Sequence, residues 1–245
     1  MDILGGASLV PGLVVLADQQ TLGRGRGGNL WISPPGCAMF SLQLQLNLVS
    51  NMGAKPSLIQ HIVGLAVAET LRSFHNQFEV RLKWPNDIYY KDQVKLGGVI
   101  ANSSFLGSTI IVNIGCGVNL NNLEPTISVN NILSGLGSAP ISREAYLSVL
   151  FNTLENLIDL YNQGNQDILF QRYYKYWLHE NQEIKLEIEP ENSQNKCSRV
   201  DIVKIVGLDE FGYLRVMEEN GHEFSVHDDR NSFDMTKGLI RPKFS

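Results

Sequence analysis

Apolar and polar positions over the first 180 residues follow both strand-like and helix-like periods. Apolar runs and two-residue alternation predict five strands, at 13–17, 41–50, 79–83, 96–104 and 109–115. Apolar residues at helical spacing predict three helices, at 57–73, 142–161 and 166–178, the first behind Ser57 as an N-cap. This mixture predicts an α+β domain over residues 1–180, with a mixed sheet and packed helices.

The pattern changes beyond residue 181, where helical spacing disappears. Four short strands are expected, at 183–188, 199–207, 212–218 and 222–227. Asp209–Gly212 and Asn220-Gly221 are turn signals, and the second favours a type I′ hairpin. The polar stretch Glu187–Ser198 is expected to be a long exposed loop. Residues 181–245 are therefore predicted to form a small β-barrel.

Composition narrows the classes of function. The chain has 245 residues, a net charge of −5 and three cysteines. It has no apolar run of about 18 residues that could span a membrane. It also has no basic block of the kind that binds nucleic acid. Three widely spaced cysteines favour a reducing compartment, and Asp2 stands where a secretory signal would be positive. A cytoplasmic chain is therefore expected.

The segment Gly23-Arg24-Gly25-Arg26-Gly27-Gly28 is the most informative one. Its glycines let backbone N–H groups approach an anion, and its arginines are permanently charged donors. It lacks the Gly-Lys-Ser/Thr ending of a phosphate-binding P-loop. Pro34-Pro35-Gly36 rules out the helix that a dinucleotide-binding fingerprint needs next. The segment predicts a loop for carboxylate or phosphate, with a plain surface turn as the alternative.

Two further segments carry polar residues at strand ends. In Lys83-Trp84-Pro85-Asn86-Asp87, the amide and carboxylate could hold magnesium beside phosphates, or could form a turn with their own backbone. In Lys95-Leu96-Gly97-Gly98, the glycine pair suggests close approach of another group to the strand. Lys95 would then neutralise an anion there, although a solvated lysine is the alternative.

A third strand, at 114–121, runs into Gly115, Gly117, Asn119 and Asn121, a weaker signal for phosphate contacts. Trp31 follows the glycine loop and could stack on a flat base. The histidines show no metal-ligand spacing. Cys116 has no basic neighbour in the sequence that would make it a nucleophile.

Taken together, these segments resemble the biotin–protein ligases. The resemblance rests on Gln-Thr-x-Gly-Arg-Gly-Arg-Gly-Gly-Asn-x-Trp-x-Ser-Pro, Lys-Trp-Pro-Asn-Asp, Lys-x-Gly-Gly and Gly-x-Gly-x-Asn-x-Asn, in that order. The segment Asn231–Met235 is similar to the eukaryotic form, holocarboxylase synthetase. The resemblance covers nearly the whole chain. It implies a class II synthetase-like catalytic domain followed by a small SH3-like barrel.

The resemblance also implies a reaction in two steps. Biotin and ATP would form biotinoyl-5′-AMP, with Mg²⁺ present, and a lysine of an acceptor carboxylase domain would then receive the biotin. The residues it implies for biotin binding are Gln20, Arg24, Gly25, Arg26 and Lys95. Those implied for nucleotide binding are Gly23, Trp31 and Asn119. Asn86 and Asp87 would bind the magnesium ion. Lys95 and Arg26 would be catalytic.

The chain departs from the family pattern at its start. Family catalytic domains carry a Ser/Thr-Thr/Ser-Asn motif on a first strand and helix, and the 22 residues before Gly23 contain no such motif. We therefore expect the catalytic domain to lack that strand and helix. No helix-turn-helix segment is present, so no repressor role is expected.

The resemblance implies that the protein partners are the acceptor domains of carboxylases, and that the chain binds neither nucleic acid nor membrane. It implies a monomer or a homodimer. It also allows a mitochondrial form besides the cytoplasmic one. A lipoate–protein ligase with the same acyl-adenylate chemistry is one alternative. A catalytically impaired module that still binds its ligands is the other.

Overall fold

The computed structural model describes residues 10–122, 126–188, 199–228, 231–234 and 238–242. The chain divides into two compact units, Met1–Leu178 and His179–Ser245. Each unit contains one six-stranded sheet. The units are described separately below.

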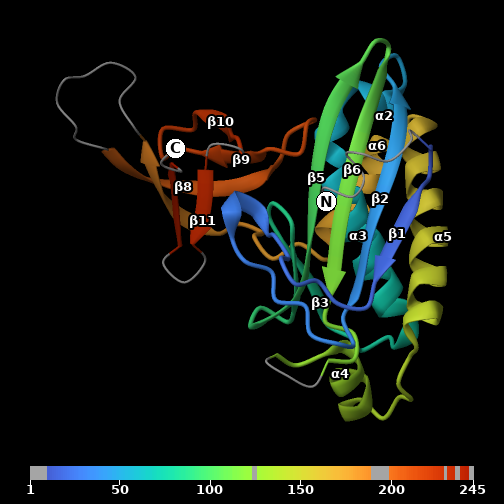
Figure 1. Cartoon of the computed structure of the whole chain (residues 1–245). Helices are drawn as coiled ribbons and strands as arrows, with labels where there is room; N and C mark the ends of the chain where they lie inside the picture. The colour runs from blue at the N-terminus through green and yellow to red at the C-terminus, as the bar shows by residue number, and fades with distance from the viewer. Residues whose placement is uncertain (1–9, 123–125, 189–198, 229–230, 235–237, 243–245) are drawn as a thin grey trace. The chain divides into compact units, whose positions relative to one another are not determined.

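The sheet of the first unit has the strand order β1-β2-β6-β5-β4-β3 (Figure 1). Its strands are β1 (Val14–Ala17), β2 (Ala38–Asn47), β3 (Val80–Lys83), β4 (Asp87–Tyr90), β5 (Val94–Leu106) and β6 (Thr109–Val118). Each pair of neighbouring strands is antiparallel. A single parallel bridge joins Leu82 to Trp177, so the sheet is mixed only at this point among the described residues.

The helical elements of the first unit are η1 (Arg26–Gly28), α2 (Asn51–Ala54), η2 (Pro56–Leu58), α3 (Ile59–Phe74), α4 (Val129–Gly135), α5 (Arg143–Asn162) and α6 (Gln166–Tyr174). Figure 1 shows α3 behind the sheet. Most of its residues are buried, including Ile62 and Leu65. Phe151 of α5 packs edge-on against Phe40 of β2, with 5.1 Å between ring centroids. The main core therefore lies between the helices and one face of the sheet.

Helix α5 forms where the apolar spacing predicts it. Its predicted inward residues, Tyr146, Leu150, Leu154, Leu157 and Tyr161, are all buried. Its start is fixed by Ser142, whose side chain accepts a hydrogen bond from the backbone N–H of Ala145. The helix begins at Arg143, one residue after the start that the periodicity predicts.

Two local predictions for the first unit are wrong. Ser57 does not cap a helix, because it lies inside η2, and α3 begins at Ile59 with no side-chain cap. The capping serine in this region is Ser50, at the start of α2. The alternation of leucines with polar residues over 41–50 predicts Gln43 on the exposed face of its strand. Gln43 is instead buried, and its amide donates a hydrogen bond to Asn113 Oδ1 over 3.1 Å.

The second unit is the sheet predicted from the short strands, extended by two more. Its strands are β7 (Glu183–Ile188), β8 (Arg199–Leu208), β9 (Leu214–Met217), β10 (Glu223–Val226), β11 (Asn231–Asp234) and β12 (Leu239–Pro242), in the order β10-β9-β8-β7-β12-β11. β12 pairs with β7 in parallel, and the other neighbours are antiparallel. Whether this sheet is an SH3-like barrel stays a prediction.

The turns of the second unit follow the sequence signals in part. Asp209 accepts hydrogen bonds from the backbone of Phe211 and Tyr213 and so forms the predicted turn. In the β9–β10 hairpin only Gly221 has a positive φ, of 85°, so the type I′ turn predicted for Asn220-Gly221 is wrong. Residues 189–198, most of the predicted exposed loop, lie outside the described residues.

Within the described ranges, no helix combines the length and the apolar character that crossing a bilayer would need.

The Ser142 cap gives a test of the fold. Replacing Ser142 with Ala should lower the free energy of unfolding by about 1 kcal/mol, because the N–H of Ala145 loses its acceptor. Urea denaturation followed by circular dichroism measures this change. Ser148→Ala, on the exposed side of the same helix, is the matched control and should leave stability within about 0.5 kcal/mol of the parent. Equal effects of the two substitutions would contradict the cap.

Candidate active site on the sheet

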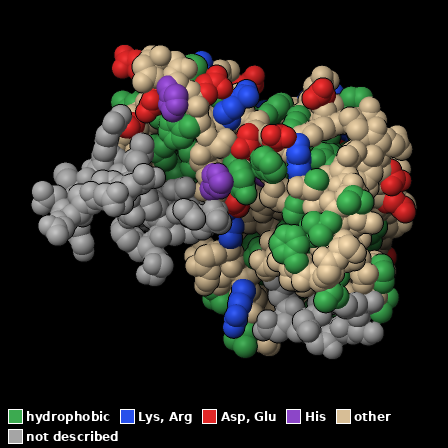
Figure 2. Space-filling view, turned by 90° about the horizontal axis from the view of Figure 1, so that it is seen from above, with side chains coloured by type: hydrophobic (Ala, Val, Ile, Leu, Met, Phe, Trp, Pro, Cys, Tyr) green, Lys and Arg blue, Asp and Glu red, His purple; other side chains and the backbone are tan. Residues whose placement is uncertain are grey.

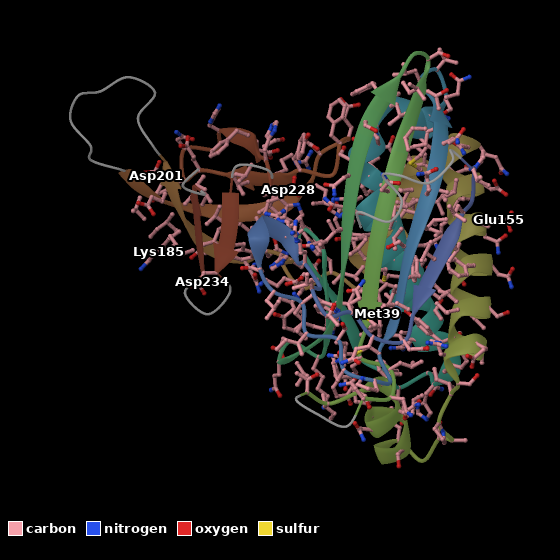
Figure 3. All side chains as sticks on the ribbon, in the orientation of Figure 1. Met39, Glu155, Lys185, Asp201, Asp228 and Asp234 are labelled. Atoms are coloured by element: carbon pink, nitrogen blue, oxygen red, sulfur yellow. The ribbon has the colours of Figure 1, made fainter. Side chains whose placement is uncertain are left out.

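A continuous row of opposed residues crosses the sheet of the first unit. Its members are Ala17, Met39, Gly117, Gly98, Asp87 and Lys83, one from each strand. Opposed residues of an antiparallel pair point to the same face of a sheet. Phe40, next to Met39, packs against α5, so the row lies on the face away from the helices. Met39 is labelled in Figure 3.

The middle of this row has no side chains. Gly98 and Gly117 are register partners on β5 and β6, and we call them the glycine floor. A Cβ added at Gly117 would lie 2.9 Å from Cζ2 of Trp31, which is too close for any larger residue. A Cβ at the neighbouring Gly97 would lie 2.5 Å from the Gly117 carbonyl oxygen. The glycines are therefore required by close packing, and Trp31 lies against the floor.

A bulge in β5 brings Lys95 to the same face. β4 pairs Ile88 with Gly97 but Tyr89 with Lys95, so one extra residue, Leu96, interrupts the register. Such an insertion shifts the phase of the strand. Leu96 is completely buried, whereas Lys95 Nζ lies 2.6 Å from Asp87 Oδ1. The bulge thus places an apolar residue in the core and its charged neighbour beside the glycine floor.

Charged and aromatic groups gather around Asp87. Its second carboxylate oxygen lies 3.9 Å from Lys83 Nζ, and Lys83 Nζ lies 5.8 Å from the ring centroid of Tyr89. Burial, and after it the negative charge of Asp87, raises the pKa of Tyr89. The tyrosine therefore stays neutral at physiological pH. Asp87 lies between two ammonium groups.

The glycine-rich loop is folded back on itself beside this face. Gln20 pairs with Ser33 and Arg24 with Leu30 as isolated antiparallel bridges. The backbone N–H of Trp31 donates to the Gly23 carbonyl over 2.9 Å, and that of Gly25 to the Asn29 carbonyl over 2.6 Å. The loop therefore has a hairpin-like closure that holds Trp31 in place.

The two arginines of the loop differ in exposure. Arg24 is exposed, and Arg26, at the start of η1, is half-buried. The structure thus joins Trp31, Lys95 and Asp87 around the glycine floor. That Arg24 and Arg26 face the same ligand stays a prediction.

Asn119, expected to face a nucleotide, is engaged in a buried polar network. It is 6% exposed, and its Nδ2 donates to Thr126 Oγ1 over 2.7 Å. Its Oδ1 accepts from Cys37 Sγ over 3.4 Å, and the same thiol lies 3.7 Å from Asn122 Oδ1. The network ties the start of β2 to the segment after β6, so Asn119 holds the end of the floor strand.

The expected magnesium ligands form a limited donor set. Asn86 Nδ2 donates to the Val99 carbonyl over 2.7 Å, which fixes the turn before β4. Asp87 already faces Lys95 and Lys83. In the part of the chain that the structure describes, no three His, Cys, Asp or Glu residues lie close enough to hold a metal ion. The residues fit a protein-held magnesium poorly, and the assignment of Asn86 and Asp87 to Mg²⁺ stays a prediction.

Charge on the face seen in Figure 2 is mixed in sign, because the described lysines and arginines are interspersed with aspartates and glutamates. The net charge of −5 agrees with this distribution.

Part of the chain matches a broad class of ligases. Residues 5–119 match the Biotin/lipoate A/B protein ligase family. The solved biotin protein ligase of Aquifex aeolicus, in complex with biotin and ATP, superposes with a TM-score of 0.68 at 23% identity, covering 92% of this chain and 90% of that one. The Leishmania major enzyme with biotinyl-5-AMP gives 0.57 at 20% identity, covering 92% of each chain. These structures show the α+β fold with its second small sheet.

Sequence relatives narrow the class further. Biotin–protein ligase 2 of Arabidopsis thaliana is 34% identical over 239 residues, which cover 95% of this chain and 70% of that protein. The chain belongs to the biotin–protein ligase family. The human biotin–protein ligase is 39% identical over 240 residues, and these cover 95% of this chain but 32% of the human protein. The chain thus spans about a third of the human relative's length.

Sequence reasoning missed two buried groups of this face. Cys37 is one of the three widely spaced cysteines, for which the sequence suggests no partner, and the alternation over 41–50 places Gln43 on the polar side of its strand. Both make hydrogen bonds to residues that are distant in the sequence. Cys37 bonds to Asn119, 82 positions away, and Gln43 bonds to Asn113, 70 positions away. A cross-strand register would have been needed to find them.

The buried thiols predict a dependence of stability on pH. Burial raises the pKa of Cys37 to about 11 and that of Cys116 to about 12. Above about pH 9 the unfolded chain loses these protons while the folded chain keeps them, so stability falls by about 1.4 kcal/mol per pH unit for each thiol. Urea unfolding from pH 8 to 10 should show a smaller fall in Cys37→Ala/Cys116→Ala than in the parent. Parallel curves would contradict the raised pKa values.

Proposed function

We propose that this chain activates biotin with ATP as biotinoyl-5′-AMP and transfers the biotinoyl group to a lysine of an acceptor carboxylase domain. The observation that carries the proposal is the glycine floor, bordered by Trp31 on one side and by Lys95 and Asp87 on the other, in a member of this family. Trp31 covers Gly117, so Gly98 is the glycine of the floor that a ligand would approach, beside Lys95. The names of its relatives support biotin as that ligand.

The first step joins two anions. A carboxylate oxygen of biotin bonds to the α-phosphorus of ATP, the bond from that phosphorus to the bridging oxygen breaks, and pyrophosphate leaves with the electron pair. Fixed positive charge lowers the repulsion between the reactants, and more so as charge develops on the phosphoryl oxygens. Lys95 supplies it, because its side chain is 42% exposed and its ammonium is held at the floor by Asp87.

The glycine loop supplies the remaining contacts. Gln20, Arg24 and Gly25 hold biotin, and the Arg26 guanidinium faces the phosphate. Gly23 and Trp31 border the nucleotide, and Asn119 holds the end of the floor strand from its buried network. Catalysis is positioning together with electrostatic stabilisation, and no covalent enzyme intermediate is formed.

In the second step the neutral amine of the acceptor lysine attacks the acyl carbon of biotinoyl-5′-AMP. The bond from that carbon to the phosphate oxygen breaks, AMP leaves, and the amine loses a proton to solvent. An amide results. Aminolysis competes with hydrolysis, so retention of the adenylate under the folded loop favours transfer.

The proposal is tested by replacing Lys95. Lys95→Ala should lower biotin-dependent pyrophosphate release by at least about 100-fold, because the ammonium facing both anions is lost. Lys91→Ala is the matched control, since Lys91 pairs with Glu79 on the surface, and it should retain activity. Thermal melting of both variants checks folding. Near-normal turnover by Lys95→Ala would remove the assigned role.

The same assay measures substrate choice. Wild-type protein should release pyrophosphate with biotin and not with lipoate at equal concentration. Release with lipoate alone would support the lipoate ligase alternative. Binding of biotin without any release would support an impaired binding module.

A second substitution separates two roles for Asp87. If Asp87 positions Lys95, Asp87→Asn should lower kcat by about 10-fold or more while the Mg²⁺ concentration for half-maximal rate changes by less than about twofold. Initial rates over a Mg²⁺ titration give both quantities. A large increase in the Mg²⁺ requirement would instead show that Asp87 is a metal ligand. Asp92→Asn, three residues from Lys95 and outside the row, is the control.

A further inference from the structure

The base of the glycine-rich loop is held by one side-chain hydroxyl. Ser33 Oγ accepts a hydrogen bond from the backbone N–H of Gln20 over 3.0 Å and donates one to the Gln20 carbonyl oxygen over 3.1 Å. Ser33 is only 3% exposed, so water competes little for these bonds. A serine or threonine hydroxyl donates and accepts at a single atom, which few other side chains can do. Both polar backbone groups of Gln20 therefore have the same side chain as partner.

The register of the loop explains why a side chain makes this link. The loop is closed by two bridges, Gln20–Ser33 and Arg24–Leu30. Between them, three residues lie on the first strand and two on the second, so the register slips by one residue. Such a slip interrupts the regular ladder of backbone hydrogen bonds. Pro34 follows directly and has no N–H to continue the ladder. The Ser33 hydroxyl thus ties the two strands together where backbone pairing ends.

Gln20 directs its side chain into the loop. A Cβ added at Gly23 would lie 3.1 Å from Gln20 Oε1 and 2.3 Å from the Trp31 carbonyl oxygen. The side-chain amide of Gln20 therefore lies over a position without a side chain, close to the strand that carries Trp31. The place of this amide is set by the Gln20 backbone, and Ser33 fixes that backbone.

The ion pair next to the base of the loop is a weaker anchor. Asp18, two residues before Gln20, lies 2.5 Å from Arg143 Nη1, but the Asp18 side chain is 90% exposed. Exposed ion pairs contribute little to stability, because water and salt screen them. Since the bonds of Ser33 are shielded from water, they restrain Gln20 more strongly than this ion pair does.

We propose that Ser33 is a positioning residue for biotin binding. Its hydroxyl fixes the backbone of Gln20, and the fixed backbone presents the Gln20 side chain to the ligand. Ser33 acts through Gln20 and takes no part in the chemistry. That biotin is the ligand, and that Gln20 binds it, rests on the proposed function. The link between Ser33 and Gln20 rests on the two hydrogen bonds.

The test removes the hydroxyl and then restores it. Calorimetric titration with biotin compares wild type, Ser33→Ala and Ser33→Thr. Ser33→Ala should weaken binding by about 10-fold, because the backbone of Gln20 loses the group that holds it. Ser33→Thr keeps a hydroxyl and should stay within about threefold of wild type. In assays of pyrophosphate release, Ser33→Ala should raise the KM for biotin by about 10-fold and change kcat by less than about twofold.

Two measurements separate positioning from a general loss of stability. Hydrogen exchange of the Gln20 backbone N–H should become faster in Ser33→Ala and stay slow in Ser33→Thr, because the hydroxyl protects it. Ser73→Ala is the matched control, since Ser73 Oγ donates to the Thr70 carbonyl oxygen over 2.7 Å at the end of α3. It also removes a hydrogen bond from a serine to the backbone, yet it should leave the biotin affinity and the KM unchanged.

Biotin affinity and KM of Ser33→Ala within twofold of wild type would overturn the inference and leave the proposed function intact. A Ser33→Thr variant that protects the Gln20 N–H but binds as weakly as Ser33→Ala would also overturn it. Weak binding together with fast exchange in both variants would support it. Wild type that binds biotin but releases no pyrophosphate would refute the proposed function, while the binding comparison would still decide the inference. Wild type that does not bind biotin would refute both.

Discussion

The close approach of Trp31 to Gly117 is the contact on which the candidate site depends. It requires a residue without a side chain at the end of β6, and the folded-back glycine loop holds the indole in that position. Because β5 and β6 are paired in register, the same requirement extends to the neighbouring strand at Gly97. Substituting larger residues here would push the loop from the sheet. Glycine content that would weaken an ordinary strand therefore lets the indole pack directly on the sheet.

Electrostatics on this surface is arranged by a few groups. Asp87 holds Lys95 close and lies near Lys83, so the cations are positioned before any ligand arrives. Preorganised charge of this kind needs no rearrangement during a reaction. The cost is that a carboxylate competes with the ligand for the same ammonium. A bound anion must therefore be favoured by further donors around the floor.

Much of this unit could be predicted from sequence because the relevant signals are local. The helical spacing of α5 lies within one segment and is confirmed, and the structure adds a serine cap that the sequence analysis did not name. Short elements gave weaker signals, and neither β4 nor α4 was expected. Gln43 shows the limit of alternation, since both faces of β2 are covered at that position and a polar residue is buried. Serine alone also does not define a cap, as Ser57 and Ser50 show.

The candidate site was predicted to a different extent for each residue. The glycine pair beside Lys95 indicated close approach of another group to the backbone. At Gly97 the neighbouring strand makes such an approach, whereas a Cβ at Gly98 would have no neighbour closer than 3.4 Å. The motif order also identified the family, as the relatives show. The buried partners of Asn119 were not predictable, because Cys37 reaches it only through the pairing of β2 with β6. Spacing along the chain reveals a strand and its ends but not which distant side chain meets it.

The extra residue in β5 has a consequence for how this sequence can vary. If one residue is removed between Lys95 and Gly98, the pairing of β4 with β5 becomes regular, because Lys95 would then lie two positions from Gly98 and still point to the same face. A single-codon deletion there would therefore keep the amine beside Asp87, but it would remove Leu96 or Gly97, both of which pack closely. A regular strand of the present length would instead place Lys95 three positions from Gly98, on the opposite face. Comparable chains with one residue fewer in this interval should therefore have a straight strand in place of the bulge.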